Sequence, residues 1–382
     1  MTKMTGDQLP VLVVVQLTGG NDFMNTLVPY SNGTYHDSRP TVRISEEEVL
    51  PINDNFGFYD KAAPLKELYD QGKMAVIQGV GYPNSDRSHF RGMDIVHTCE
   101  PISIGTEGWV ARAVRQLDPS KQNVLTCINI GRGLPRAMAA PGVTVTSVGN
   151  LDNCGLMTGL AEHGHRDHAL SLFEKTYVPV MTEGHEGVVM DYLAQTGMDV
   201  IEGADRLSVV PSNYSSDVEY PDNPIGNSLR DVARIHLADM GTRIFYTSHG
   251  GYDYHSNQVP THARLMAELS GAISAFYKDL EAHSAGNNVV MLVFTEFGRR
   301  IKDNGSGTDH GSGGGSYIIG NAVKGGLYAD YPSLNPNEWL NGEDLSHTID
   351  FRGVYGTLLE QWLDLDAIPI VGGTFEQIQP FN

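Results

Sequence analysis

Cysteine is scarce in this chain. The 382 residues include three cysteines, Cys99, Cys127 and Cys154, and no two of them have the CxxC spacing. An odd number without that spacing argues against a disulfide framework and against a cysteine-based zinc site. We expect the three thiols to be small, buried hydrophobic side chains.

Positive charge is also in short supply. The chain has 26 Lys and Arg against 46 Asp and Glu, a formal net charge of −20. Nucleic acids and anionic membrane surfaces are bound by neutralising phosphates with Lys and Arg, so we expect neither as a partner. The negative electrostatic field of the chain also opposes binding of a phosphorylated or sulfated substrate, unless a metal or a local group of arginines makes the field positive at the site.

Long apolar runs are missing too. The longest one near the start, 9–17, has about half the length of a membrane span and lacks the basic flank of a signal peptide. We therefore expect no membrane insertion, and a chain that is either already mature or cytoplasmic.

Apolar material is sufficient for a large core. Hydrophobic residues make up 40% of the chain and charged residues 19%, which is typical of a globular protein. Because α/β folds often hold this many residues in one unit, we expect a single domain over 1–382. The region 131–222 is less regular, and we interpret it as a cap or insertion.

Buried strands alternate with helices along the sequence. Continuous apolar runs predict strands at 11–17, 74–80, 123–130, 243–247, 289–294 and 316–319. Helical patterns cover 64–71, 88–98, 167–177, 188–206, 229–240, 262–283 and 351–363. This alternation predicts an α/β fold whose mainly parallel sheet is covered by helices on both faces.

Residues able to bind a metal follow three of the predicted strands. Ligands of open parallel sheets bind outside the carboxyl ends of the strands, and carboxylates mixed with imidazoles suit zinc, manganese or iron. The candidate ligands are Asp22, Asp253, His255, Glu296, Asp309 and His310. The sequence therefore predicts a metal centre at this edge of the sheet.

Each candidate also has an ordinary structural interpretation. An Asp after Gly-Gly-Asn, such as Asp22, is often a turn residue or a helix N-cap. His255 and His310, taken singly, resemble surface histidines. Glu296 is more informative, because a charge that ends a buried strand must be paired, metal-bound or exposed at a cleft.

Two serines lie where a loop enters a predicted helix. Ser85 and Ser88 could each be only an N-cap, but a hydroxyl beside a metal and a helix N-terminus can ionise and act as a nucleophile. Arg87 or Arg299 would then steady an anionic substrate. The histidines at 163, 165 and 168 fall in the irregular block, and we interpret them as part of a solvated loop.

Several motifs together resemble a known family. These are LTGGND at 17–22, RSHF at 87–90, GYDYHSNQ at 251–258, TEFGRR at 295–300 and TDHG at 308–311. They look like the family called domain of unknown function 1501, over nearly the whole chain. That family is similar to the alkaline-phosphatase-like superfamily of phosphatases, sulfatases and phosphomutases.

The resemblance implies a three-layer sandwich with a mainly parallel sheet, one or two metals, and a Ser, Thr or Cys nucleophile. It also implies a periplasmic or secreted protein, since members often carry a twin-arginine signal, although this chain shows none. By the same resemblance Asp22 matches the first-strand metal ligand, and Asp253 with His255 matches the other metal position. Ser88 or Ser85 would be the nucleophile, with His89 in the same catalytic segment.

The remaining ligands can be assigned in two ways. Asp309 and His310 either form the superfamily's Asp-His-Gly motif, or the strand end at Glu296 takes that place and His310 is a later, third histidine. We favour the second assignment, because the motif normally follows its strand directly. Phe297 then stands where a histidine belongs, so a single metal is as consistent as two, and His262 is a substitute ligand.

The sequence thus predicts a metal-dependent hydrolase of phosphate or sulfate esters, acting on a small molecule or a glycan. One or two divalent ions are expected, zinc or manganese before iron or calcium. A formylglycine sulfatase is disfavoured, because neither serine lies in a Cys-x-Pro-Ser-Arg sequence. The alternatives are a non-catalytic protein of the same fold that binds a glycan or anion, and a metalloenzyme with redox chemistry.

Overall fold

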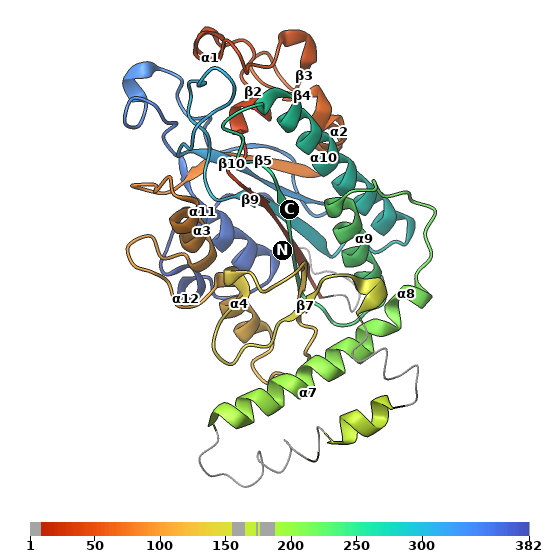
Figure 1. Ribbon diagram of the computed structural model, residues 1–382. Helices are drawn as coiled ribbons and strands as arrows, with labels where there is room; N and C mark the ends of the chain where they lie inside the picture. The colour runs from red at the N-terminus through yellow and green to blue at the C-terminus, as the bar shows by residue number, and fades with distance from the viewer. Residues whose placement is uncertain (1–8, 155–164, 173–174, 176–187, 382) are drawn as a thin grey trace.

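The computed structural model describes residues 9–154, 165–172, 175 and 188–381. Its centre is a nine-stranded sheet in the order β11-β5-β10-β9-β1-β8-β6-β7, with β12 paired to β5 (Figure 1). The strands are β1 (Val11–Thr18), β5 (Met74–Gly81), β6 (Cys127–Ile130), β7 (Thr146–Val148), β8 (Ile244–Gly250), β9 (Val289–Thr295), β10 (Gly314–Gly320), β11 (Gly326–Tyr328) and β12 (Ile349–Asp350). The six predicted strands all lie in this sheet.

Most strand pairs are parallel, as predicted. β1 lies between β8 and β9 and is parallel to both, and β6 continues the parallel arrangement next to β8. β10 is the exception, since it is antiparallel to both of its neighbours, β9 and β5. A parallel return needs a crossover that is usually a helix, whereas the glycine-rich segment between β9 and β10 forms only loops and bridges.

Side chains of β1 alternate between two hydrophobic cores, one on each face of the sheet. Val13 and Val15 belong to the first core, while Leu12 and Val14 belong to the second. This follows from the two-residue period of a strand, and it explains why a strand covered on both faces is apolar at every position.

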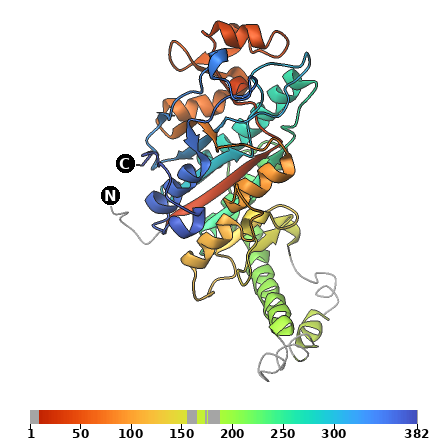
Figure 2. The same ribbon diagram turned by 90° about the vertical axis from the view of Figure 1, so that its left-hand side faces the viewer.

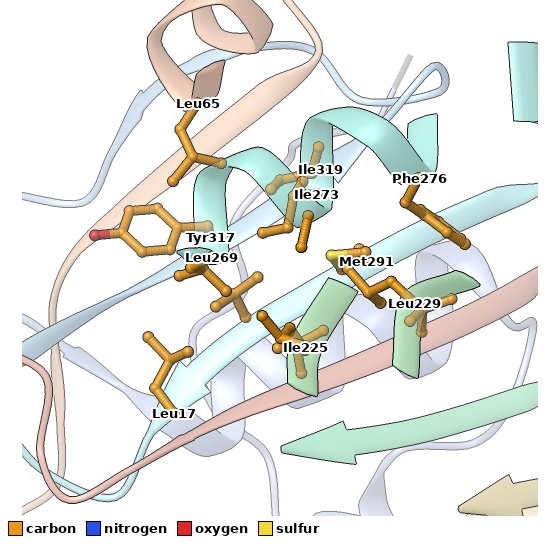
Figure 3. Close-up of a cluster of buried hydrophobic side chains, with 14 of the residues drawn as sticks. Leu17, Leu65, Ile225, Leu229, Leu269, Ile273, Phe276, Met291, Tyr317 and Ile319 are labelled. Carbon is orange, nitrogen blue, oxygen red and sulfur yellow. The ribbon is translucent and has the colours of Figure 1, made fainter. Parts of the chain in front are cut away.

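Helices from different parts of the chain cover the two faces. The first face packs against α2 (Ala63–Asp70), α9 (Pro224–Leu237) and α10 (Gln258–Ala282), and Figure 3 shows their side chains meeting those of the strands. The second face packs against α3 (His89–Thr98), α4 (Trp109–Leu117), α11 (Phe351–Thr357) and α12 (Ile368–Val371). Helices therefore lie on both sides of the sheet, and the predicted α/β three-layer class is confirmed.

The structure adds elements that the sequence does not predict. A small sheet, β2-β4-β3, forms from Leu27–Val28, Gly57–Tyr59 and Val49–Pro51. Its strands have two or three residues, too few for a periodic pattern. The predicted C-terminal helix is divided, since α11 continues as a π-helix over Leu358–Trp362.

The helix α7 (Val188–Ser208) projects from the body at the end opposite the small sheet, as both views show (Figures 1 and 2). It lies within the block predicted to be an insertion, part of which falls outside the described residues. Cys99 and Cys127 are buried as expected, while Cys154 is only half-buried. Within the described part of the chain, no helix has the length and apolar character to cross a membrane.

Candidate metal centre

A cluster of histidines and carboxylates lies at the carboxyl ends of the central strands. Its members come from the start of α3, the loops after β8 and β9, and the loop before β10. They are His89, Asp253, His255, Glu296, Asp309 and His310. The sequence predicts five of these six as metal ligands and His89 only as a catalytic residue.

Asp253 is at the middle of the cluster. Its Oδ1 lies 3.0 Å from His310 Nε2 and 3.1 Å from His255 Nε2, and its Oδ2 lies 3.3 Å from His89 Nε2. The two nitrogens His255 Nε2 and His310 Nε2 are themselves 3.0 Å apart. Three imidazole nitrogens thus converge on one carboxylate.

The other ring nitrogen of each histidine is bound to an oxygen acceptor. His89 Nδ1 lies 2.9 Å from Glu296 Oε1, and His255 Nδ1 lies 2.9 Å from Asp309 Oδ1. His310 Nδ1 lies 2.7 Å from the carbonyl oxygen of Arg87. Because these oxygens accept hydrogen bonds, each Nδ1 is placed to donate one, and Nε2 of each ring is directed at Asp253, where it could bind a metal.

This arrangement has the features of a metal site. His89, Asp253 and His310 offer ligand atoms within 4.8 Å of one another. His89 Nε2 is buried without a hydrogen-bond partner among the described residues. Glu296 and Asp309 touch histidines rather than the centre, so they match the outer carboxylates that orient metal-bound imidazoles.

The groups of the cluster respond differently to their surroundings. Burial opposes ionisation of Asp253, but hydrogen bonds from Arg299 and His310 outweigh it and lower the pKa of this carboxyl. The hydrogen bond to Glu296 raises the pKa of His89, whereas burial lowers the pKa of His310. The hydrogen bond with His255 lowers the pKa of Asp309.

One side of the cluster is apolar and the other is open. The ring of Phe297 packs 4.9 Å from the rings of both His89 and His310. The side chains of Asp253 and His255 are 45% exposed, so a ligand can reach the centre from their side. Phe297 occupies a position where the family resemblance implies a histidine, and its apolar ring has no atom that could bind a metal.

The structure does not bring Asp22 into the cluster. Its Oδ2 lies 2.6 Å from a nitrogen of the buried Arg39 and 2.5 Å from Gln258 Nε2. Burial alone would raise the pKa of Asp22, but the guanidinium beside it lowers this pKa instead. The guanidinium group of Arg39, which is fully buried, thus lies beside Asp22 where the sequence suggested a metal.

His262, suggested as a substitute ligand, is also placed elsewhere. It is buried in α10, where its Nδ1 lies 3.0 Å from the hydroxyl of Tyr254 and its Nε2 lies 3.0 Å from the carbonyl oxygen of Asn25. Both ring nitrogens are therefore engaged within the protein.

The two arginines proposed for substrate binding differ in their surroundings. The side chain of Arg299 is fully buried, and its donors reach Asp253 and the carbonyl oxygens of Gly19, Gly20, Tyr252 and Thr308. Through these contacts it holds the loops around the cluster together. Arg87 is 29% exposed and pairs with Glu343 and Asp344.

The two candidate serines are not equivalent. Ser88 is the N-cap residue of α3, is exposed, and makes no side-chain capping hydrogen bond. It lies between Arg87, whose carbonyl oxygen binds His310, and His89, whose ring is part of the cluster. Ser85 is half-buried, with its hydroxyl toward Tyr82.

A large cavity lies away from the cluster. Its volume is about 890 Å³, and its lining includes β7 and residues of α7, with no member of the cluster. His165 and His168 are exposed and lie outside the cluster as well. His163 lies outside the described residues.

Comparison with known proteins finds distant likenesses among solved structures. Solved structures that match include a protein of the alkaline phosphatase superfamily from Vibrio parahaemolyticus, with 12% identity, 99% of this chain and 72% of that chain covered, and a TM-score of 0.45. A putative sulfatase from Bacteroides thetaiotaomicron matches with 9% identity, 98% and 76% coverage, and a TM-score of 0.40. A sulfatase from Pseudoalteromonas matches with 10% identity, 87% and 66% coverage, and a TM-score of 0.37. Such distant likenesses assign no residue role to this chain.

The family comparison is more specific. The model described as "Protein of unknown function (DUF1501)" matches residues 219–353, which include Asp253, His255, Glu296, Asp309 and His310. The predicted resemblance to this family is therefore confirmed over residues 219–353, while the motifs at 17–22 and 87–90 lie outside the match. No curated protein matches the sequence.

Proposed function

We propose that this chain is a metal-dependent hydrolase of phosphate or sulfate esters. The observation that carries the proposal is the convergence of three imidazole Nε2 atoms on Asp253, with every Nδ1 bound to an oxygen acceptor. Ring nitrogens and a carboxylate this close together share a proton or a cation, and one divalent cation would satisfy all of them at once.

The donor set fits a single divalent ion. His255, His310 and Asp253 present atoms 3.0 to 3.1 Å apart, close to the spacing of about 3 Å that ligands adopt around an ion bound at about 2.0–2.1 Å. His89 is the fourth candidate ligand. A set with three nitrogens suits zinc, manganese or iron better than calcium, whose ligands are oxygens.

Charge supports the same conclusion. Three carboxylates contact the histidines, namely Asp253, Glu296 and Asp309, and among the described guanidinium groups only Arg299 donates a hydrogen bond to one of them. The cluster is thus negative as it stands. A bound divalent ion would neutralise it and would polarise an oxygen of the ester group.

Ser88 is the nucleophile in this proposal. Its hydroxyl is exposed at the N-terminus of α3, where the helix dipole favours negative charge. As Ser88 Oγ bonds to phosphorus or sulfur, its hydroxyl proton passes to solvent, the ester bond to the leaving oxygen breaks, and the leaving oxygen takes a proton from solvent and departs as the alcohol. Water then hydrolyses the seryl ester and restores the hydroxyl.

The substrate is proposed to be an ester of a small molecule or a glycan, and the location to be periplasmic or secreted, both in keeping with the family resemblance. The negative overall charge makes the metal the main attraction for an anionic substrate.

The first test is elemental analysis of the purified chain, followed by assays with aryl phosphates and aryl sulfates. We expect about one zinc or manganese per chain and turnover that chelation abolishes. Bound metal without any turnover would support the non-catalytic binding protein instead. Iron or copper with redox activity would support a metalloenzyme with redox chemistry.

The second test separates the serines. Ser88→Ala should reduce kcat by at least about 100-fold, because the nucleophile is lost, while the metal content stays unchanged. Ser85→Ala is the matched control and should retain activity. Equal activity of the two variants would contradict the role of Ser88.

A further inference from the structure

A pair of arginines lies beside the candidate metal centre and shares one carboxylate. Glu343 Oε2 is 3.4 Å from a terminal nitrogen of Arg87 and 3.2 Å from one of Arg300. Both distances are long for charge-assisted hydrogen bonds, which are usually about 2.7–2.9 Å. The two guanidinium groups are therefore directed at one loosely held anion.

Both arginines are anchored directly to the histidine cluster. The carbonyl oxygen of Arg87 accepts the hydrogen bond of His310 Nδ1. The backbone N–H of Arg300 donates to the carbonyl oxygen of Asp309, whose side chain binds His255. A ligand between the guanidinium groups would thus be a neighbour of a ligand at the centre.

The arginines are more restrained than the carboxylate between them. Arg87 Nε lies 3.1 Å from the buried Asp344, and the side chains of both arginines are 29% exposed. Glu343 is 46% exposed. It follows Asn341 and Gly342, which have positive φ angles of 55° and 73° and form a tight turn.

Arg300 also has an unused donor. Its Nε is buried and has no hydrogen-bond partner among the described residues, although the terminal nitrogen approaches Glu343 and, at 3.7 Å, Asp309. A buried donor without a partner is costly, and a planar anion with several oxygens could satisfy it. Glu343 contributes a single oxygen to both arginines.

We infer that Arg87 and Arg300 form a subsite for a second anionic group of the substrate, and that Glu343 occupies this subsite until the substrate displaces it. The inference rests on the proposed function for the identity of the first group. The substrate class is then a phosphate or sulfate ester whose other end carries a carboxylate, phosphate or sulfate.

A pair of non-hydrolysable probes tests this without turnover. Phenylphosphonate carries one anionic group, and 4-phosphonobenzoate adds a carboxylate. We expect calorimetry on the metal-loaded chain to show about 10-fold tighter binding of the second probe. Arg300→Met should remove this preference, and Arg300→Lys should retain part of it, because the charge remains without the planar fork.

Two further variants complete the design. Glu343→Gln should strengthen binding of 4-phosphonobenzoate several-fold, because the competing carboxylate is gone. Lys302→Met is the matched control: it removes an exposed positive charge two residues from Arg300, and the preference should survive.

The outcomes distinguish this inference from the proposed function. Three results would contradict the subsite: equal affinity of the wild type for both probes, no binding of either probe, or an equal loss of the preference in Arg300→Met and Lys302→Met. None of them bears on metal content or turnover, which are measured separately. The expected preference in a chain without turnover would support the subsite and contradict the hydrolase.

Discussion

Glu296 is the most deeply buried carboxylate that touches the histidine cluster. Its side chain is 1% exposed, and its Oε1 accepts hydrogen bonds from His89 Nδ1 at 2.9 Å and from the N–H of Gly19 at 2.8 Å. It thus fixes the tautomer and the direction of the His89 ring, which is the role of a carboxylate behind a metal-bound imidazole.

Glu296→Gln should weaken metal binding by about 10- to 100-fold, because the amide is a poorer acceptor and no longer favours the orientation of His89. Competition with a chelator of known affinity measures this. Glu268→Gln is the matched control, since Glu268 also binds an imidazole, His249, at 3.2 Å but outside the cluster. The same loss in both variants would show that the effect is not specific to the centre.

A buried polar network joins three elements beneath the cluster. Gln16 of β1 accepts hydrogen bonds from His97 of α3, at 2.9 Å, and from the hydroxyl of Tyr246 of β8. Burial lowers the pKa of His97 to about 4. This histidine is therefore neutral in the folded chain at pH 7.

Stability should depend on pH through this residue. Because the unfolded chain binds the proton with a pKa near 6.5, the contribution of His97 is fully present above that pH and is lost as pH falls from about 6.5 to 4. The loss is about 3 kcal/mol. His97→Gln keeps a donor for Gln16 and should flatten this part of the pH profile in denaturant unfolding.

The comparison must be made as a difference from the wild type, because burial also lowers the pKa values of His236, His249 and His262. An unchanged slope between pH 6.5 and 4 in His97→Gln would rule out this role.

Close backbone contact joins the loop after β9 to the loop that carries His310. A Cβ atom at Gly298 would lie 1.9 Å from the carbonyl oxygen of Gly313, so only glycine fits there. The N–H of Gly311 also donates to the carbonyl oxygen of Gly298, at 2.8 Å. The position of His310 therefore depends on this contact.

Gly298→Ala should lower the free energy of unfolding by about 1–3 kcal/mol, the usual cost of overpacking, and should also weaken metal binding. Gly33→Ala is the control, because a Cβ there meets nothing within 4 Å. Thermal unfolding and chelator competition give the two readouts. A destabilised variant with unchanged metal affinity would show that the contact does not position His310.

At the scale of the whole molecule, the sequence predicts the main helices and strands well, but it predicts less well which strands pair and in which direction. The apolar runs that become β1 and β9 are buried on both faces, which makes them visible without any structure. The direction of β10 and the two- and three-residue strands of the small sheet depend on loop geometry and on pairing with distant residues. Local patterns do not record either property.

The candidate site shows the same division. The rule that ligands bind at the carboxyl ends of parallel strands brings together residues from distant segments, and Asp253, His255 and His310 are indeed neighbours. The cation beside Asp22 could not be foreseen, because nothing in the sequence around Arg39 indicates that its side chain is fully buried against that carboxylate. His89 is a candidate ligand because its ring points toward Asp253, and the direction of a side chain at the start of α3 cannot be read from the sequence.

The charge of the cluster ties the stability of the whole chain to its metal. Folding holds His255 Nε2 and His310 Nε2 3.0 Å apart, and Asp253 lies 3.1 Å and 3.0 Å from them, so the folded chain presents these groups together to an ion. An ion that binds only the folded chain adds about 2.7 kcal/mol at a free concentration 100-fold above its Kd. Chelation should therefore lower the midpoint of denaturant unfolding, and zinc or manganese should restore it.

His255→Ala provides the control for this effect. The variant removes one candidate ligand from the centre, so added metal should stabilise it far less than it stabilises the wild type. If metal stabilised the wild type and His255→Ala equally, the ion would be bound at another place, and the convergence of the three imidazoles on Asp253 would have a purely structural cause.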